Sequence, residues 1–235
     1  MKLSSSSHSD IGRVRPENED SFLCDDELGL YGVADGIGGL PAGAQASQLT
    51  VLAARDFIAH AKAPDNIDYS ACIEAVNGKV YMLGRLLSPR TGIGSTLTFA
   101  HVVGTNLHSG HIGDSGLLRL REGKFISLTT EHTVENELRG RNGGSELGLL
   151  EQRNALTRCI GQPPPATGDY AIHALQPGDR YLFCTDGVGR AIPHHDLVRL
   201  MTDSPDPQTC VHALVDAAND RGGLDNATAV VLFVE

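Results

Sequence analysis

Five aspartates lie in short segments, most of them rich in glycine, that are spread over almost the whole chain. The segments are Asn18-Glu19-Asp20, Asp35-Gly36-Ile37-Gly38-Gly39, Gly113-Asp114-Ser115-Gly116, Thr185-Asp186-Gly187 and Asp225-Asn226. Three of them directly follow runs that are typical of strands. A strand that ends in Asp-Gly places a carboxylate and an accessible backbone carbonyl at the rim of its sheet. Several such ends gathered at one rim would form the oxygen-rich ligand set that Mg²⁺ and Mn²⁺ prefer.

Each segment taken alone has a simpler interpretation. Asp35-Gly36 and Asp186-Gly187 are common residues of tight turns, and Arg15 ahead of Glu19-Asp20 could be a solvated surface pair. Gly38-Gly39 is not followed by Gly-Lys-Ser/Thr, so the sequence does not predict a nucleotide site. If the carboxylates do converge, cations are needed to offset their repulsion and desolvation.

Bulk composition excludes several classes of protein. The chain has 235 residues, of which 40% are hydrophobic and 20% charged, which is typical of a globular protein with a sizeable core. The net charge of −10 argues against nucleic acid and against an anionic membrane as partners. No apolar run is long enough to predict a membrane span, and the polar residues 1–9 do not resemble a signal peptide.

The five cysteines are far apart and form no C-x-x-C pair, so we expect neither a zinc site nor a redox centre. Free thiols suit a reducing compartment, and we therefore expect a cytoplasmic protein.

The pattern of apolar residues predicts the elements that must position the acids. Residues 42–63 and 67–87 are predicted helices, and Pro41 suits the first turn of the former. Hairpin turns are expected at Gly104-Thr105 and Glu122-Gly123. Strands are predicted at residues 30–34, 95–100, 106–112, 116–121, 124–128, 170–175, 181–185 and 227–234, and two further helices near 195–202 and 207–220.

This order of elements is not a regular alternation of strands and helices. A parallel, doubly wound sheet is therefore not expected, and helices that cover antiparallel sheets in a layered α+β domain fit better. The chain contains no internal repeat and no long linker, so we expect one domain over residues 1–235, acting as a monomer.

The same segments carry a resemblance to a known family. Residues 9–20 (SDIGRVRPENED) resemble the opening motif of bacterial PP2C-type (PPM family) serine/threonine phosphatases, and residues 33–39 (VADGIGG) resemble the second. The later motifs GSTLT, HIGDS, LTR, CTDG and DNAT follow in the order of the family. The resemblance covers nearly the whole chain. It implies a four-layer αββα sandwich in which two mostly antiparallel sheets are flanked by helices.

The resemblance also implies how two Mn²⁺ or Mg²⁺ ions are held. Asp35 would bridge the two ions, and the carbonyl of Gly36 would bind one of them. Asp186 and Asp225 would complete the ligand set of the first ion. Glycine at position 36 lets the backbone approach the ion closely.

The second ion would be held by Asp20, with Glu19 as the alternative direct ligand. Asp114 together with Asp186 would form the weaker third site that is seen in bacterial relatives. A water molecule between the two core ions would be acidified and would attack phosphorus directly, without a phosphoenzyme. The chain accordingly has no cysteine in a phosphate-cradling C-x5-R loop.

Two further residues have roles that the resemblance implies. Arg15 matches the arginine that binds the phosphoryl oxygens, for which its planar fork is suited. His132 could donate a proton to the leaving alkoxide, or it could be structural; Glu131 precedes it, where relatives usually have aspartate. Residues 133–154 resemble the flap beside the family's active site, and their glycines suit a mobile loop.

The function implied by the resemblance is the metal-dependent hydrolysis of phosphoserine and phosphothreonine in proteins, opposing a bacterial serine/threonine kinase. One alternative is an inactive module that binds phosphoprotein partners, which would require a missing ligand. Another is the branch of the family that controls sigma-factor regulators. Members of that branch generally lack the phosphate arginine and the Asn-Glu-Asp opening, so Arg15 and residues 18–20 count against it.

Overall fold

The computed structural model describes residues 1–61, 67–142 and 153–235. These residues form two five-stranded sheets, and every strand pair within them is antiparallel. The first sheet contains, in spatial order, β1 (Leu3–Asp10), β10 (Ala227–Val234), β9 (Arg180–Cys184), β6 (Gly116–Arg121) and β7 (Lys124–Ser127). The second sheet contains β2 (Asp20–Asp25), β3 (Leu30–Asp35), β4 (Leu97–Val103), β5 (Asn106–Ile112) and β8 (Asp169–Ala174).

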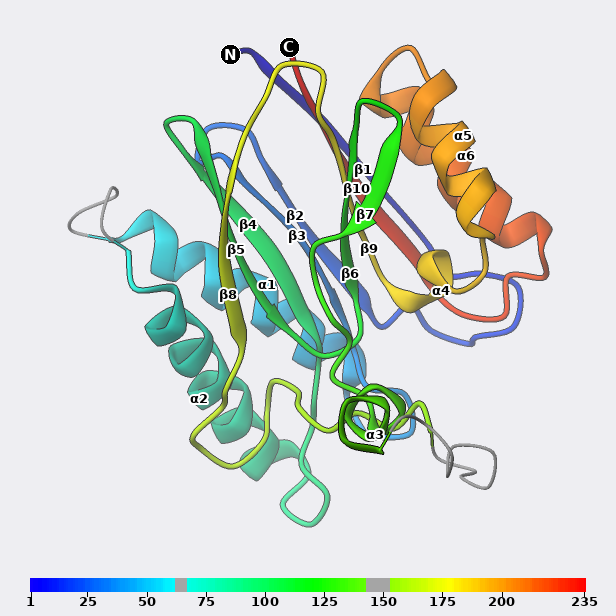
Figure 1. Ribbon diagram of the computed structural model, residues 1–235. Helices are drawn as coiled ribbons and strands as arrows, with labels where there is room; N and C mark the ends of the chain where they lie inside the picture. Colours follow the sequence, from blue (N-terminus) through cyan, green and yellow to red (C-terminus); the bar gives the residue numbers. More distant parts are fainter. Residues whose placement is uncertain (62–66, 143–152) are drawn as a thin grey trace.

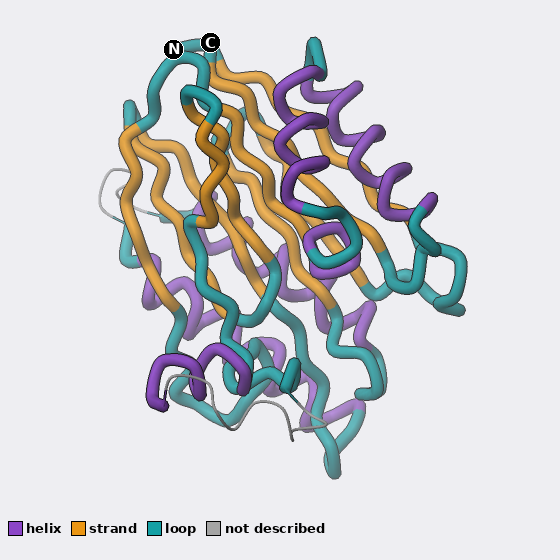
Figure 2. Tube along the Cα trace, turned by 45° about the vertical axis from the view of Figure 1, so that its right-hand side comes forward, coloured by secondary structure: helices purple, strands orange, loops and turns teal. Residues whose placement is uncertain are grey.

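Helices cover the outer faces of both sheets (Figure 1). The second sheet packs against α1 (Gly43–Ala59) and α2 (Tyr69–Leu87), and the first sheet against α5 (His194–Asp203) and α6 (Pro207–Asp220). Figure 2 shows the strands enclosed between these two pairs of helices. The predicted four-layer αββα sandwich is therefore confirmed.

Three apolar cores separate the four layers. The core between the two sheets is built on fully buried aromatic and aliphatic side chains, among them Tyr31, Tyr181 and Phe183. The other two cores lie between each sheet and its helices. β10 is buried along its whole length because it is an inner strand of the first sheet with α6 on its outer face. The prediction for residues 227–234 is confirmed with the same bounds.

Local capping signals explain where two of the helices begin. The side chain of Asp68 accepts a hydrogen bond from the backbone N of Ala71 and caps α2, and Asp206 caps α6 in the same way. The prediction for Pro41 is wrong. The helix α1 begins only after Ala42, whose left-handed backbone (φ 58°) places Pro41 outside the first turn.

The two strands at the N-terminal end of the chain were not predicted. β1 reads LSSSSHSD and has no apolar alternation, yet all eight of its residues pair with β10. β1 forms because the inner strand β10 offers its backbone hydrogen-bonding groups to a neighbour. The side chains of β1 itself give no sign of this pairing. The hairpin turn at Glu122-Gly123 is confirmed, with positive φ at both residues as a type I′ turn requires.

Two short helices lie near the ends of the strands. α3 (Val134–Asn142) falls in the predicted flap, of which residues 143–152 lie outside the described residues. α4 (Asp186–Gly189) is a single turn after β9. Within the described part of the chain, no helix has the length and apolar character needed to cross a membrane.

Candidate active site

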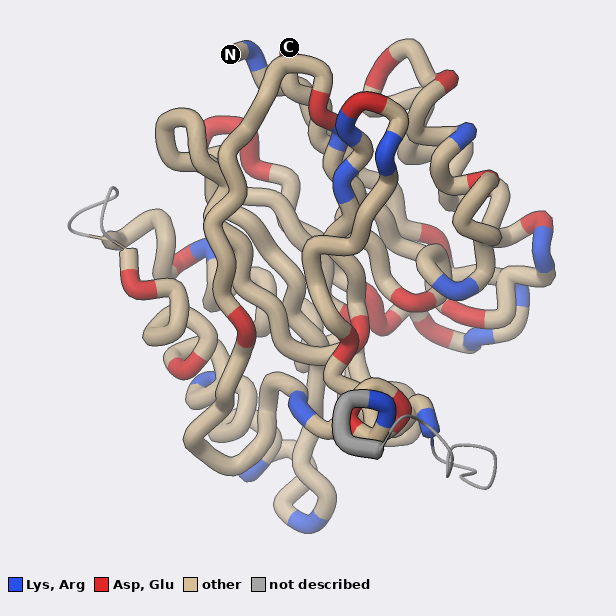
Figure 3. The backbone as a smooth tube through the Cα atoms, viewed as in Figure 1, with Lys and Arg blue, Asp and Glu red and all other residues tan. Residues whose placement is uncertain are grey.

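A cavity of about 240 Å³ lies where strands of both sheets end. Five of the acids predicted from the sequence line it, together with Arg15: Glu19, Asp35, Asp114, Asp186 and Asp225. Asp20 is not among the lining residues but is paired in register with Asp35. We refer to these six acids as the acidic cluster. Figure 3 shows several acidic positions gathered at the lower ends of the strands beside α4.

The second sheet positions Asp20 and Asp35. Asp20 begins β2 and Asp35 ends the antiparallel neighbour β3, so the two face each other across one rung of the sheet. The backbone of Asp35 is held by Thr96, whose N donates to the Asp35 carbonyl at 2.8 Å and whose hydroxyl accepts from the Asp35 N at 2.9 Å. The strand end is therefore rigid where its carboxylate enters the cavity.

The first sheet positions Asp186 and Asp225. Asp186 is the first residue of α4 and is separated from β9 only by Thr185. Asp225 lies just before β10, which pairs with β9. A side chain at Gly187 would place its Cβ 1.9 Å from the backbone oxygen of Asn226, so only glycine allows the two segments to approach. Thr185 connects the sheets, because its hydroxyl donates to Asp20 Oδ2 at 2.9 Å.

The backbone around Gly36 is tightly enclosed. Its N donates to the Glu19 carbonyl at 3.0 Å, and a Cβ at this position would lie 2.4 Å from the carbonyl oxygen of Gly43. Glu19 is held in turn by Asn226, whose Oδ1 accepts from the Glu19 N at 2.8 Å. The opening segment of the chain is thus fastened to the strand end that carries Asp35.

Burial raises the free energy of the ionised form of these acids. It raises the pKa of Asp20 to about 7 and that of Asp186 to about 6, and neighbouring carboxylates add to both shifts. The pKa of Asp35 is raised well above its usual range, first by burial and then by four other acids. Oδ1 of Asp20 is buried without a hydrogen-bond partner. The acidic cluster therefore has uncompensated negative charge that a cation would stabilise.

Two arginines offset part of this charge. Arg15 Nη2 donates to Asp225 Oδ2 at 2.7 Å, and this bond raises the pKa of Arg15. Arg190 Nη1 and Nη2 donate to Asp186 Oδ2 and Asp114 Oδ2, both at 2.7 Å. With their side chains so arranged, no three His, Cys, Asp or Glu in the described residues are grouped as ligands of one metal ion. The fit to a metal rests instead on the orphaned Asp20 oxygen and on the acids' raised pKa values.

The structure does not bring His132 to the cavity. Its side chain is 1% exposed, its Nδ1 accepts from the Gly113 N at 3.1 Å, and its Nε2 lies 3.3 Å from Asp169 Oδ2. Its backbone N also donates to the Gly113 carbonyl. This geometry favours the structural alternative, in which His132 supports the turn that carries Asp114.

The described ends of the flap are joined to each other. The backbone N of Val134 donates to the Ala155 carbonyl at 3.0 Å, and Thr133 pairs with Leu156, which lines the cavity. The two ends of the flap segment therefore meet beside a residue of the cavity wall.

Sequence reasoning missed two residues that organise the site. Asn226 Nδ2 donates to the carbonyls of Ile11 and Glu17, so this side chain holds the opening segment from three points. Its position directly after Asp225 was the only available signal. Arg190 was missed altogether, because nothing in the sequence relates it to Asp114, which is 76 positions away.

Comparisons with known proteins agree with this geometry. The family model described as protein phosphatase 2C matches residues 10–217. A putative protein phosphatase 2C-type of Streptococcus pyogenes is 31% identical, with 96% of this chain and 95% of the relative covered. The serine/threonine protein phosphatase PstP of Mycobacterium tuberculosis is 31% identical over all of this chain, which spans 45% of that protein's length. The crystal structure of the PstP catalytic domain in complex with two manganese ions has a TM-score of 0.85 at 29% identity, with 99% of each chain covered.

Proposed function

The chain belongs to the protein phosphatase 2C family and is a protein serine/threonine phosphatase, and on this premise we propose that the acidic cluster holds two Mn²⁺ or Mg²⁺ ions for the hydrolysis of phosphoserine and phosphothreonine. The observation that carries the proposal is the convergence of acids from five separate segments on one cavity. Carboxylates that share a buried site are rarely tolerated without a cation.

The residues divide between two sites. Asp35 lies at the centre, where its pKa is affected by Asp20, Asp114, Asp186 and Asp225, and it is suited to contact both ions. Asp186 and Asp225 with the Gly36 carbonyl would hold one ion, and Asp20 or Glu19 the other. When bound, the two ions would lower the pKa of a water molecule and offset the charge of the phosphoryl group.

Arg15 is suited to bind the phosphoryl group at the cavity wall. Its guanidinium lies beside Gly38, where a Cβ would come within 3.2 Å of Nη1, so glycine leaves room for it. A planar guanidinium can hold two phosphoryl oxygens at once and orient them for attack. The hydrogen bond to Asp225 fixes the side chain at the site before substrate binds.

The chain would act as one catalytic domain and as a monomer on phosphorylated proteins, and it would oppose a serine/threonine kinase. The named activities of the relatives support the substrate class. The cytoplasmic location stays a prediction. An inactive binding module is not favoured, since none of the predicted acids is missing.

Hydrolysis assays test this function directly. Purified chain is expected to release phosphate from p-nitrophenyl phosphate and from a phosphothreonine peptide when Mn²⁺ is supplied. Binding of the phosphopeptide without any hydrolysis, in Mn²⁺ and in Mg²⁺, would instead support the inactive module.

Replacing Arg15 with alanine is expected to lower kcat/KM for a phosphothreonine peptide by more than about tenfold, because a charge-assisted contact to the phosphoryl group is lost. Arg15→Lys should recover part of the loss, since lysine keeps the charge but not the fork. Arg13→Ala is the matched control, because Arg13 is on the same segment but is not among the cavity-lining residues. A kcat/KM of Arg15→Ala equal to that of the control would refute the role.

A further inference from the structure

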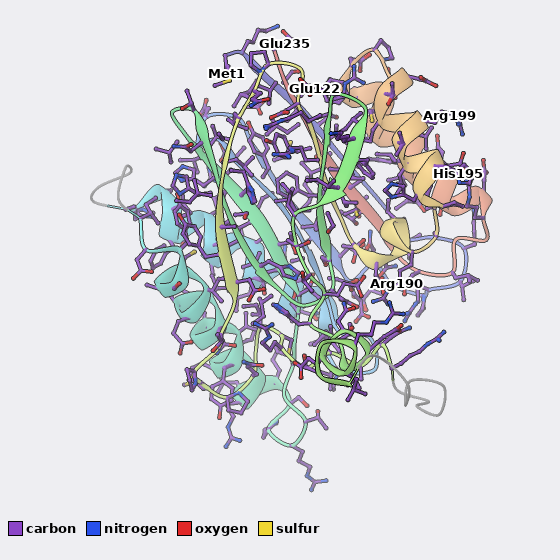
Figure 4. The ribbon with its side chains drawn as sticks, viewed as in Figure 1. Met1, Glu122, Arg190, His195, Arg199 and Glu235 are labelled. Carbon is purple, nitrogen blue, oxygen red and sulfur yellow. The ribbon has the colours of Figure 1, made fainter. Side chains whose placement is uncertain are left out.

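Arg190 forms the most extensive ionic contacts in the acidic cluster. It follows the single turn of α4, four residues after Asp186, so both side chains lie on one face of that turn. Its Nη1 donates to Asp186 Oδ2 and its Nη2 to Asp114 Oδ2, each at 2.7 Å, and Nη2 also lies 3.5 Å from Glu131 Oε2. Figure 4 labels Arg190 beside the lower ends of the strands.

These contacts occupy the place where the sequence predicted a third metal ion. That ion would be held by Asp114 and Asp186, but each of these acids has already given one oxygen to the guanidinium. Hard divalent cations take six or more oxygen ligands, of which water can supply several, so the carboxylate oxygens are the protein's main contribution to such a site. A further acid beside them, Glu131, also faces Arg190.

We propose that the guanidinium of Arg190 takes the place of a third metal ion between Asp114 and Asp186, so that this enzyme holds two divalent ions and one built-in cation. The inference rests on the proposed function, because it assumes that the remaining acids hold the two core ions. It differs from the expectation of a weaker third metal site.

Physical reasons favour the arginine over a free ion. Asp114 is only 10% exposed, so its bond to Arg190 is largely shielded from water. Arginine cannot lose its charge at accessible pH, and two bonds from one planar group to two carboxylates are stronger than separate neutral bonds. Because Arg190 is attached to the same short helix as Asp186, its effective concentration at the site far exceeds that of free metal ions.

The arrangement also has a consequence for the core ions. Arg190 leaves one oxygen of Asp186 available for a core ion while it holds the other. Asp186 is thereby oriented between a fixed cation and the cavity. Arg190 is a positioning residue in this account and not a catalytic one.

Counting bound Mn²⁺ tests the proposal with a readout other than activity. Equilibrium dialysis of the full chain should give two ions per wild-type molecule. Arg190→Gln removes the charge while keeping much of the side chain, and it should bind a third ion at least about tenfold more tightly than any third site in the wild type. Crystals of this variant soaked in Mn²⁺ should show anomalous density between Asp114 and Asp186.

Two further variants separate the possible outcomes. Arg221→Gln is the matched control, because Arg221 bonds to Asp196 and the Ala217 carbonyl and not to the acidic cluster, and it should still bind two ions. Asp114→Asn combined with Arg190→Gln should return the count to two. A wild-type chain that binds three ions, or an Arg190→Gln variant that gains none, would overturn the inference while the two-ion function stands. A wild-type chain that binds no Mn²⁺ would overturn both.

Discussion

Asp35→Asn is expected to lower kcat/KM by at least about 10³-fold, since one substitution removes the carboxylate that both core ions would share. Asparagine preserves the size of the side chain, and the backbone contacts of residue 35 with Thr96 do not involve the side chain. The fold should therefore persist. Steady-state kinetics in Mn²⁺ measure the loss, and equilibrium dialysis should show a matching loss of bound Mn²⁺.

The same variant should be more stable than the wild type when metal is removed. The folded-state pKa of Asp35 is raised well above its usual value, so the folded chain holds a proton that the unfolded chain has lost. For such a group, stability falls as pH rises above the unfolded pKa of about 4. In EDTA, the Tm advantage of Asp35→Asn should therefore be small near pH 4 and should grow toward pH 8.

The control for this variant is Asp56→Asn. Asp56 lies on α1 with a side chain 62% exposed and is not among the residues that line the cavity. Among the described residues, its only ionic contact is with Lys79 at 4.0 Å. We expect unchanged kinetics and no pH-dependent gain in Tm. Asp35→Asn with kcat/KM within a factor of ten of the wild type would rule out the bridging role of this carboxylate.

Removal of metal is expected to have the second large effect. EDTA should reduce hydrolysis of p-nitrophenyl phosphate to the background rate, and excess Mn²⁺ should restore it. Metal that binds only the folded chain also stabilises it by mass action, by about 2.7 kcal/mol at a hundredfold excess over the dissociation constant. The Tm measured in excess Mn²⁺ should accordingly be higher than the Tm of the metal-free chain measured in EDTA.

The stabilisation by Mn²⁺ should depend on pH with a defined sign. Protons compete with the ions, because burial raises the pKa of Asp20 to about 7 and that of Asp186 to about 6. Above pH 7 these acids are ionised and ready to bind metal, whereas below pH 6 metal must displace protons. The rise in Tm on adding Mn²⁺ should thus be larger at pH 8 than at pH 5.5.

Thermal unfolding with and without Mn²⁺ at the two pH values measures this difference. Comparing the two conditions at each pH cancels the contribution of groups outside the site, such as the buried His111, whose pKa burial lowers to about 4. Hydrolysis that persists in EDTA would contradict a metal site. A Mn²⁺-induced Tm shift that is larger at pH 5.5 than at pH 8 would contradict a site built from carboxylates with raised pKa values.

Elements with strong local patterns could be predicted well. Helix α6 has Asp206 as its cap and Pro207 in its first turn, and β10 is apolar except for Thr228. Both elements were predicted with the bounds that the structure has. β1 could not be predicted in this way, because its serines carry no periodic signal. Its position is decided by the backbone hydrogen-bonding groups along one side of β10, which is more than 200 residues away in the chain.

The acids of the site were also recognisable from the sequence. Four of the five aspartates stand beside glycine or asparagine, Asp20 being the exception, and the order of the motifs pointed to one shared site. The partners of these acids were not recognisable. His132 was considered as a proton donor, whereas the packing of Gly113 and Asp169 around it places its ring in the interior.

The sequence by itself therefore indicated most of the helices and strands and the acids that meet at one cavity, because both depend on neighbouring residues and local periodicity. Only the tertiary structure decided which charges meet. The contacts Arg15–Asp225 and Arg190–Asp114 join residues 210 and 76 positions apart, and they exist because sheet register and the turn of α4 bring these side chains together. Contacts between residues so far apart in the chain depend on how whole layers pack together, which no short segment of the chain encodes.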